Sequence, residues 1–231
     1  MYDLTPFTQR WNQYQTSKDL FTESGYANLS FDTPHSPPSP QTQAIWTDLL
    51  VIEQSPRPEI LINAWQSMPS SGYDFSLGRD KIVVKYSLSE DRTHSFTLDQ
   101  LRPPVHAHVL VASTVLREAD SCSSGMSLKD LYARIRLRVS AADSLLRLYT
   151  IIAHAVGDNR AQFEDVQFDY SSAVDYLEFY EGADIPCIDR KYIPLQVSDV
   201  SFSSNLSGLV DVRQSERAAE LMKSPLFRGL V

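Results

Sequence analysis

The chain has 231 residues, of which 42% are hydrophobic and 22% charged, and its net charge is -8 at pH 7. That length allows one domain with a substantial core plus an extension, and the composition is typical of a globular protein. The acidic balance argues against a protein that coats nucleic acid through a broadly basic surface, because such binding depends on neutralising many phosphates.

Cysteine usage and hydropathy bear on compartment and cofactors. Cys122 and Cys187 cannot make a disulfide framework, and neither has the paired spacing of a structural zinc site. Residues 1–20 lack the charged start and apolar run of a signal peptide, and no stretch approaches the ~18 apolar residues of a membrane helix. We therefore expect a cytoplasmic or nuclear protein with no cofactor, no metal and no membrane contact.

Proline and serine divide the chain into an arm, a domain and a tail. Residues 9–23 could form a short helix, whereas a linker follows because its prolines favour extended backbone: Pro34, Pro37, Pro38 and Pro40. We expect a flexible N-terminal arm over residues 1–42, a globular domain over 43–224 and a C-terminal tail over 225–231.

Hydrophobic spacing predicts the elements of the domain's first half. They are a helix over 44–54, a helix or strand over 59–65, a β-hairpin with strands at 81–88 and 94–98, and a helix from Pro103-Pro104 to about Ala119.

The second half begins with the strongest pattern in the chain. A strand over 132–139 leads through Ser140, a plausible N-cap, into a helix over 141–156 that Gly157 ends. The remaining segments are a strand over 163–170, a possible helix over 173–180, extended backbone near 193–200 and a helix over 211–223. Together these elements predict a single α+β domain in which helices pack on an antiparallel or mixed sheet.

Three arginines alternate with apolar residues in the strand expected over 132–139. Arg134, Arg136 and Arg138 would lie on one face about 6.5–7 Å apart, which is close to the phosphate spacing of an extended single strand. An acidic stretch follows, since residues 161–189 contain eight Asp or Glu and no Lys or Arg. We expect the arginines to pair with Asp165 or Asp169 across the sheet, and the alternative is that they bind nucleic acid.

Histidines provide weak candidates for chemistry. His106 and His108 are spaced for a shared face on a strand, but a helix is expected there and no third metal ligand is evident. Arg147 and His154 resemble, over eight residues, the Arg-x4-6-His spacing of HEPN-type ribonucleases, although Leu148 stands where that pattern has a polar residue. An ordinary helix with His154 near its C-terminus explains the same residues. We expect no catalytic residue among them.

Function is inferred by elimination, because the sequence has no GxSxG, GxxxxGK[ST], GxGxxG or HExxH motif. The leading interpretation is a non-enzymatic adaptor or assembly component that binds a protein partner or itself. Phe227 and Leu230 in the tail could contact that partner or pack on their own domain. The alternative is a module that binds RNA or single-stranded nucleic acid through Arg134, Arg136 and Arg138. A metal-dependent or HEPN-like nuclease ranks third.

Overall fold

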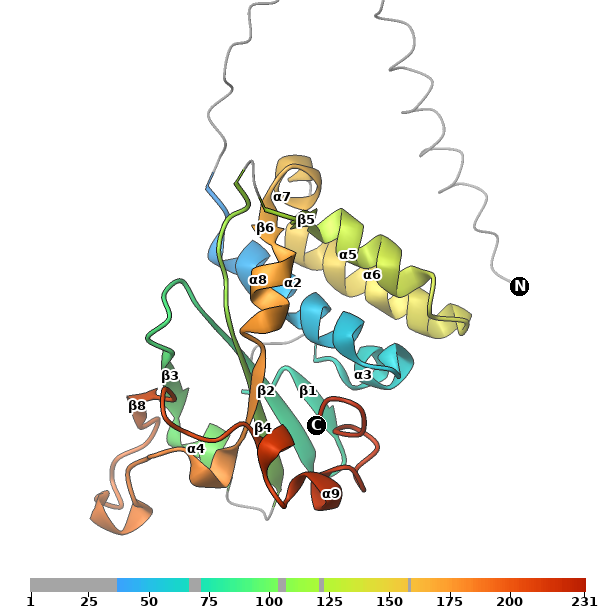
Figure 1. Ribbon diagram of the computed structural model, residues 1–231. Coiled ribbons are helices and arrows are strands. Elements are labelled where there is room, and N and C mark those ends of the chain that lie inside the picture. Colours follow the sequence, from blue (N-terminus) through green and yellow to red (C-terminus); the bar gives the residue numbers. More distant parts are fainter. Residues whose placement is uncertain (1–36, 67–71, 104–106, 121–122, 158) are drawn as a thin grey trace, which may run out of the picture. The chain divides into compact units, whose positions relative to one another are not determined.

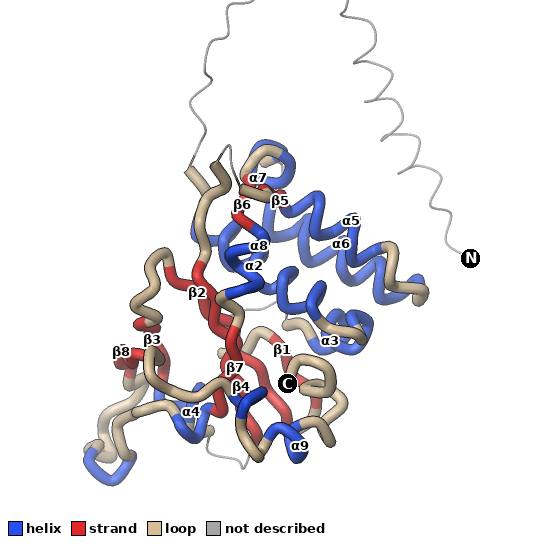
Figure 2. The backbone as a smooth tube through the Cα atoms, in the orientation of Figure 1, coloured by secondary structure: helices blue, strands red, loops and turns tan. Residues whose placement is uncertain are grey.

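Four strands form the central sheet in the order β1–β2–β4–β7 (Figure 2). They are β1 (Phe75–Leu77), β2 (Asp80–Ser87), β4 (His108–Val115) and β7 (Glu178–Glu181). β2 runs parallel to β4, whereas β1–β2 and β4–β7 are antiparallel, so the sheet is mixed. This arrangement confirms the expected α+β class.

The computed structural model describes residues 37–66, 72–103, 107–120, 123–157 and 159–231. Most of the expected N-terminal arm, together with His106 and Cys122, lies outside the described residues. No helix in the described part of the chain combines the length and the apolar character needed to cross a bilayer.

Helices cover one face of the sheet (Figure 1). The longest are α2 (Pro40–Gln54), α3 (Pro58–Ala64), α5 (Leu128–Arg136) and α6 (Ala142–Val156). α2 begins at Pro40 rather than near Gln43, because the Ser39 hydroxyl accepts the Thr42 N–H at 3.0 Å and caps the helix. α6 ends at Gly157, as expected, where φ is +58°. The segment 59–65, which the sequence left open, is helical.

The opposite face of the sheet carries a second, smaller core. Val83, Val111 and Tyr180 point into it from the sheet, and Phe96 and Leu206 close it from the other side. β3 (Thr93–Thr97) and β8 (Ser201–Asn205) form a two-stranded sheet there, next to α4 (Leu98–Leu101). β2 is therefore buried between two cores. The alternation of apolar residues in β2 predicted burial of one face, and the structure buries the other face as well.

The expected hairpin between 81–88 and 94–98 is wrong. β3 pairs with β8, whereas β2 pairs with β4 along its whole length and with β1 over residues 80–82. The expected helix from Pro103 to Ala119 is also wrong, since β4 occupies this region. Its run of Val109 to Val115 is buried on both faces, which favours a central strand rather than an amphipathic helix.

Short elements replace several longer ones that the sequence predicted. Of the strand expected over 163–170, only the short strand β6 forms, and it pairs with β5. In place of the helix expected over 173–180 the chain has the end of α8 and the start of β7. The helix expected over 211–223 is shortened to α9. These elements are α7 (Arg160–Glu164), α8 (Tyr170–Asp175), α9 (Ala218–Leu221), β5 (Gly125–Ser127) and β6 (Gln167–Asp169).

The C-terminal tail packs against the chain's own domain. Leu226, Phe227, Leu230 and Val231 are buried in the core on the helical side. Gly229 has φ of +93° and a Cβ there would lie 2.2 Å from Cγ of Pro56, so only glycine allows the tail to turn at this close approach. The structure therefore places Phe227 and Leu230 inside the domain rather than on a surface that could contact a partner.

Replacing Phe227 with alanine should lower the free energy of unfolding by roughly 3–5 kcal/mol, because it removes a buried aromatic ring from the core. The control is Leu195→Ala, whose side chain is 98% exposed and whose loss should cost less than about 0.5 kcal/mol. Urea unfolding of both variants measures the difference. Equal effects would show that the tail does not contribute to the core.

Candidate functional site

The three arginines expected on a strand lie on and after helix α5. The Ser127 hydroxyl accepts the Asp130 N–H at 3.2 Å, and the Asp130 carboxylate accepts the Ser127 N–H at 2.9 Å. This capping box starts a helix at Leu128, and the side chains of Leu131 and Ile135 fall on its buried face. The strand expected over 132–139 is therefore wrong, because its alternation covers too few residues to separate a period of two from a period of 3.6.

Two of these arginines bind the end of α2 instead of the acidic stretch. Arg134 forms an ion pair with Glu53 at 2.8 Å, and its guanidinium carbon lies 4.7 Å from the ring centroid of Tyr170. Arg138 donates hydrogen bonds to the backbone carbonyls of Glu53 and Ser55. Arg136 is exposed on the helix. The row of evenly spaced guanidinium groups that a nucleic-acid strand would need does not form.

The nearest acidic strand also takes a different position from the one expected. β6 pairs with β5, and the Asp169 carboxylate caps α8 by accepting the Ser172 N–H at 3.1 Å. The expected pairing of the arginines with Asp165 or Asp169 is therefore wrong.

The histidine candidates do not converge with other polar groups into a site. His108 is exposed at the start of β4, and His154 is exposed near the end of α6. The Arg147 guanidinium donates to the carbonyls of Ile62, at 2.9 Å, and of Trp65, which ties α6 to α3. Within the described ranges, no three His, Cys, Asp or Glu residues are grouped so that they could hold a metal ion.

A different group of charges lies at the edge of β2. Asp74 directly precedes β1 and binds the backbone of β2 on both sides of Val83. Its N–H donates to the carbonyl of Ile82 at 3.0 Å, and its carboxylate accepts the Val84 N–H at 2.6 Å. The β1–β2 ladder ends at the pairing of Phe75 with Ile82, so the carboxylate satisfies an N–H that the short strand β1 leaves unpaired. These bonds fix the carboxylate against the central strand.

Asp48 on α2 adds a second buried carboxyl group near Asp74. Burial raises the pKa of Asp48 well above its ordinary value, and the charge of Asp74 raises it further. The indole N–H of Trp65 donates to Asp48 at 2.9 Å and opposes that increase. Burial also raises the pKa of Asp74, although the Val84 N–H and the charge of Lys85 act in the other direction. The two carboxyl groups therefore hold protons more tightly than exposed ones.

Lys85 on β2 provides the positive charge beside Asp74. Burial lowers the pKa of Lys85, and the charge of Asp74 opposes that decrease. The ammonium nitrogen lies 5.2 Å from the ring centroid of Phe96. No residue in the described part of the chain accepts a hydrogen bond from it or forms an ion pair with it. The side chain is partly buried, so its charge lies in surroundings less polar than bulk water.

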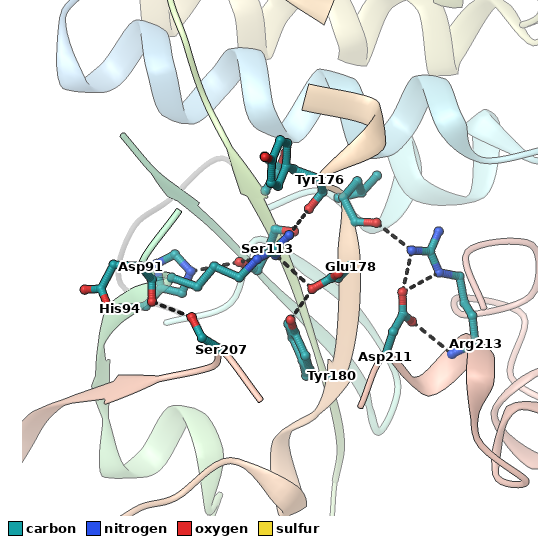
Figure 3. A network of polar contacts seen from close by, with 12 residues as sticks. Asp91, His94, Ser113, Tyr176, Glu178, Tyr180, Ser207, Asp211 and Arg213 are labelled. Carbon is teal, nitrogen blue, oxygen red and sulfur yellow. Dashed lines mark hydrogen bonds and ion pairs between the residues drawn. The ribbon is translucent and has the colours of Figure 1, made fainter. Parts of the chain in front are cut away.

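A polar network that includes Ser113, Glu178 and His94 lies on the same face of the sheet (Figure 3). Lys85 is the register partner of Ser113 on β4, and Ser113 is the register partner of Glu178 on β7. Arg92, which is 6% exposed, donates to Ser113 Oγ at 3.3 Å and forms an ion pair with Glu178 at 3.2 Å. His94 Nε2 lies 2.8 Å from Ser113 Oγ.

The environment of His94 keeps its imidazole neutral at physiological pH. Burial, together with the charges of Lys85 and Arg92 and against a smaller opposing effect of Asp91, lowers its pKa to about 4. Lys85, Arg92 and His94 thus gather on one face of the sheet in a chain that is acidic as a whole. Sequence reasoning missed this group, although a lysine inside the apolar run Ile82–Tyr86 was a visible signal that a buried charge needs a partner.

A double-mutant cycle between Arg134→Ala and Glu53→Gln should give a coupling free energy on the order of 1 kcal/mol, because the ion pair joins a half-buried guanidinium to a buried carboxylate. The matched cycle of Arg134→Ala with Asp165→Asn should be additive. Coupling of Arg134 to Asp165 but not to Glu53 would instead support the pairing of the arginines with the acidic segment that was expected from the sequence.

Replacing Asp48 with asparagine should remove a pH dependence from the free energy of unfolding. The pKa of Asp48 is raised in the folded state, so its contribution to stability is fully present below the unfolded value of 3.8 and is lost as pH rises through the folded pKa. The asparagine amide keeps an oxygen that can accept the Trp65 N–H but cannot ionise.

Urea unfolding at pH values from about 4 to 8 should therefore show wild type losing stability relative to Asp48→Asn as the pH rises. A stability difference that stays constant, or that increases in favour of wild type, would contradict the raised pKa.

Comparison with known proteins identifies the family. Residues 31–207, well over half of the chain, match the model of a family described as "Putative PD-(D/E)XK family member, (DUF4420)". No curated protein and no solved structure matches the chain.

This match corrects the functional interpretation drawn from the sequence. The PD-(D/E)XK description denotes a nuclease-like fold and points to an enzyme, so the leading interpretation of a non-enzymatic adaptor or assembly component is wrong. The absence of familiar catalytic motifs misled that analysis, because catalytic groups can come from separate strands without a contiguous motif. The chain belongs to the DUF4420 family, which carries the PD-(D/E)XK description.

Proposed function

We propose that the protein is a nuclease-like enzyme that cleaves phosphodiester bonds in nucleic acid, with Asp74 and Lys85 as its reactive groups. The observation that carries the proposal is that the Asp74 carboxylate is fixed on the backbone N–H of Val84, next to Lys85 on the central strand β2, and that the two charges act on each other's pKa. Family membership supports the reaction class. A carboxyl group with a raised pKa beside a desolvated lysine is an arrangement found more often at functional sites than elsewhere.

The motif in the family description can be compared with the chain letter by letter. Asp189-Arg190-Lys191 is the one literal match to (D/E)XK in the sequence. It lies in an exposed 3₁₀ turn, where the Asp189 carboxylate pairs with the Lys191 ammonium at 2.8 Å. Val83-Val84-Lys85 has the lysine on a central strand beside Asp74 but has valine at the acidic position. The second segment is the better candidate because an acid and a base from different segments converge there.

The chemistry of these side chains suits hydrolysis of a phosphodiester. Lys85 would donate to a non-bridging phosphate oxygen and offset the negative charge that grows on it during attack. Asp74 would accept the proton of the attacking water when it is ionised. Its bond to the Val84 N–H holds the carboxylate in one orientation, and Phe96 confines the ammonium from the other side.

The residues of this site do not fit a divalent cation. Nuclease sites that use Mg²⁺ hold it through carboxylate oxygens, which act together with substrate phosphates. Here burial raises the pKa of both Asp74 and Asp48 and so opposes the ionised form that binds a cation, and Val83 offers no oxygen from its side chain. The chain's own groups must therefore supply the charge stabilisation. Nucleic acid as the substrate also suits a cytoplasmic or nuclear location.

Lys85→Met and Asp74→Asn should each reduce cleavage by about 10²-fold or more, because each removes a group that acts on the reacting phosphate or water. Both changes nearly conserve volume, and asparagine can still accept the Val84 N–H. The control is Lys191→Met in the literal motif, which should cleave like wild type.

The measurement uses fluorescently labelled single-stranded and duplex DNA and RNA, with circular dichroism melting to verify that each variant is folded. The proposal fails if wild type cleaves none of these substrates with or without Mg²⁺ or Mn²⁺. It also fails if folded Lys85→Met and Asp74→Asn proteins are as active as wild type.

A further inference from the structure

We infer that Val83 makes the Asp74–Lys85 site independent of a divalent cation, so that Lys85 contacts the substrate phosphate directly. The first part concerns ligand binding by the chain itself, and the second part rests on the proposed function. When the lysine of the (D/E)XK motif is placed at Lys85, as proposed above, valine stands at the position of the motif's acid.

Val83 occupies the point on β2 where a second carboxylate would meet Asp74. Asp74 binds the backbone of Ile82 and Val84, the two neighbours of Val83. Residues two apart on a strand point to the same face, so a side chain at position 83 shares the face of Lys85. The apolar side chain of Val83 is 1% exposed and packs in the second core with Phe96, Val111 and Tyr180.

The remaining carboxylates cannot replace the missing oxygens. Divalent cations of the Mg²⁺ type require several oxygen ligands in a near-octahedral arrangement. Asp74 and Asp48 are the two carboxyl groups at this position, and burial opposes the ionised form of each that a cation would need. No third ligand from the described residues joins them.

The charge that a cation would bring is supplied in part by protein groups. Lys85 is partly buried without an ion pair among the described residues, whereas the buried Arg92 is held by Ser113, Tyr176 and Glu178. A phosphate that reached Lys85 would therefore meet an ammonium in partly desolvated surroundings, where charge–charge attraction is stronger than in bulk water.

Binding of Mn²⁺ to the full chain, followed by electron paramagnetic resonance, tests the cation claim directly. Wild type should show no Mn²⁺ binding that Asp74→Asn removes, up to about 1 mM Mn²⁺. Val83→Glu should gain one site and bind Mn²⁺ at least about tenfold more tightly than Val83→Gln, which has the same shape without the charge.

Two results would overturn the cation claim. One is a wild-type site for Mn²⁺ that disappears in Asp74→Asn. The other is a Val83→Glu protein that melts cooperatively and yet binds Mn²⁺ no better than Val83→Gln. If Val83→Glu does not fold, the comparison of wild type with Asp74→Asn decides alone, since it requires no new charge in the core.

Cleavage assays in excess EDTA separate this inference from the proposed function. Wild-type cleavage that is unchanged by EDTA and lost in Lys85→Met supports direct contact of Lys85 with the phosphate. Cleavage that requires Mn²⁺ overturns the inference and leaves the nuclease assignment intact. No cleavage under any condition, together with no Mn²⁺ binding, overturns the proposed function and direct phosphate contact while leaving the cation claim standing.

Discussion

The parallel pairing of β2 with β4 determines where the charged groups of this protein can lie. Both strands are buried between two cores, so each polar side chain on them needs a partner within the fold. Ser113 and Glu178 meet that requirement through Arg92 and His94, whereas Lys85 has the ring of Phe96 beside its ammonium. Within the described residues, no buried side-chain nitrogen or oxygen lacks a hydrogen-bond partner. The polar groups of the site and the apolar side chains of the core are therefore packed together on the same strands.

Asp74 shows how a single carboxylate can serve both the sheet and the site. It completes the hydrogen bonding of β2 where β1 ends, and it provides the negative charge next to Lys85. Burial opposes its ionisation, so the charged form that suits proton transfer is costly in the folded protein. Functional sites commonly retain such costs because the surrounding structure holds the group in place.

The sequence predicted individual helices and strands better than it predicted which strands pair with one another. α2, β2 and α6 were recognisable because each has a long periodic pattern and clear ends. The arginine segment was assigned wrongly because the short alternation at Arg134 to Arg138 outweighed the capping box formed by Ser127 and Asp130. The pairing of β3 with β8 joins residues about a hundred positions apart, and no local pattern encodes such a contact.

The candidate site was hidden for a related reason. Asp74 and Lys85 are brought together by the β1–β2 turn, and Val83 removes the acid that would have made the motif readable. An acid before one strand and a lysine within the next, apolar strand indicate a site only when the register of the two strands is known. Sequence spacing alone could mark Lys85 as a buried charge but could not name its partner.

The net charge of -8 remains compatible with a nucleic-acid substrate, because overall and local charge act at different distances. At physiological salt, charges farther apart than about 8 Å are largely screened, so the acidic surface mainly slows approach at low salt. Contact with a phosphate depends on groups within a few ångströms of it, which in the proposed site are Lys85 and Asp74. An enzyme that must release its product benefits from this combination, since a broadly basic surface would hold the cleaved strands. Composition therefore excluded a nucleic-acid coat without excluding an enzyme that acts on nucleic acid at one point.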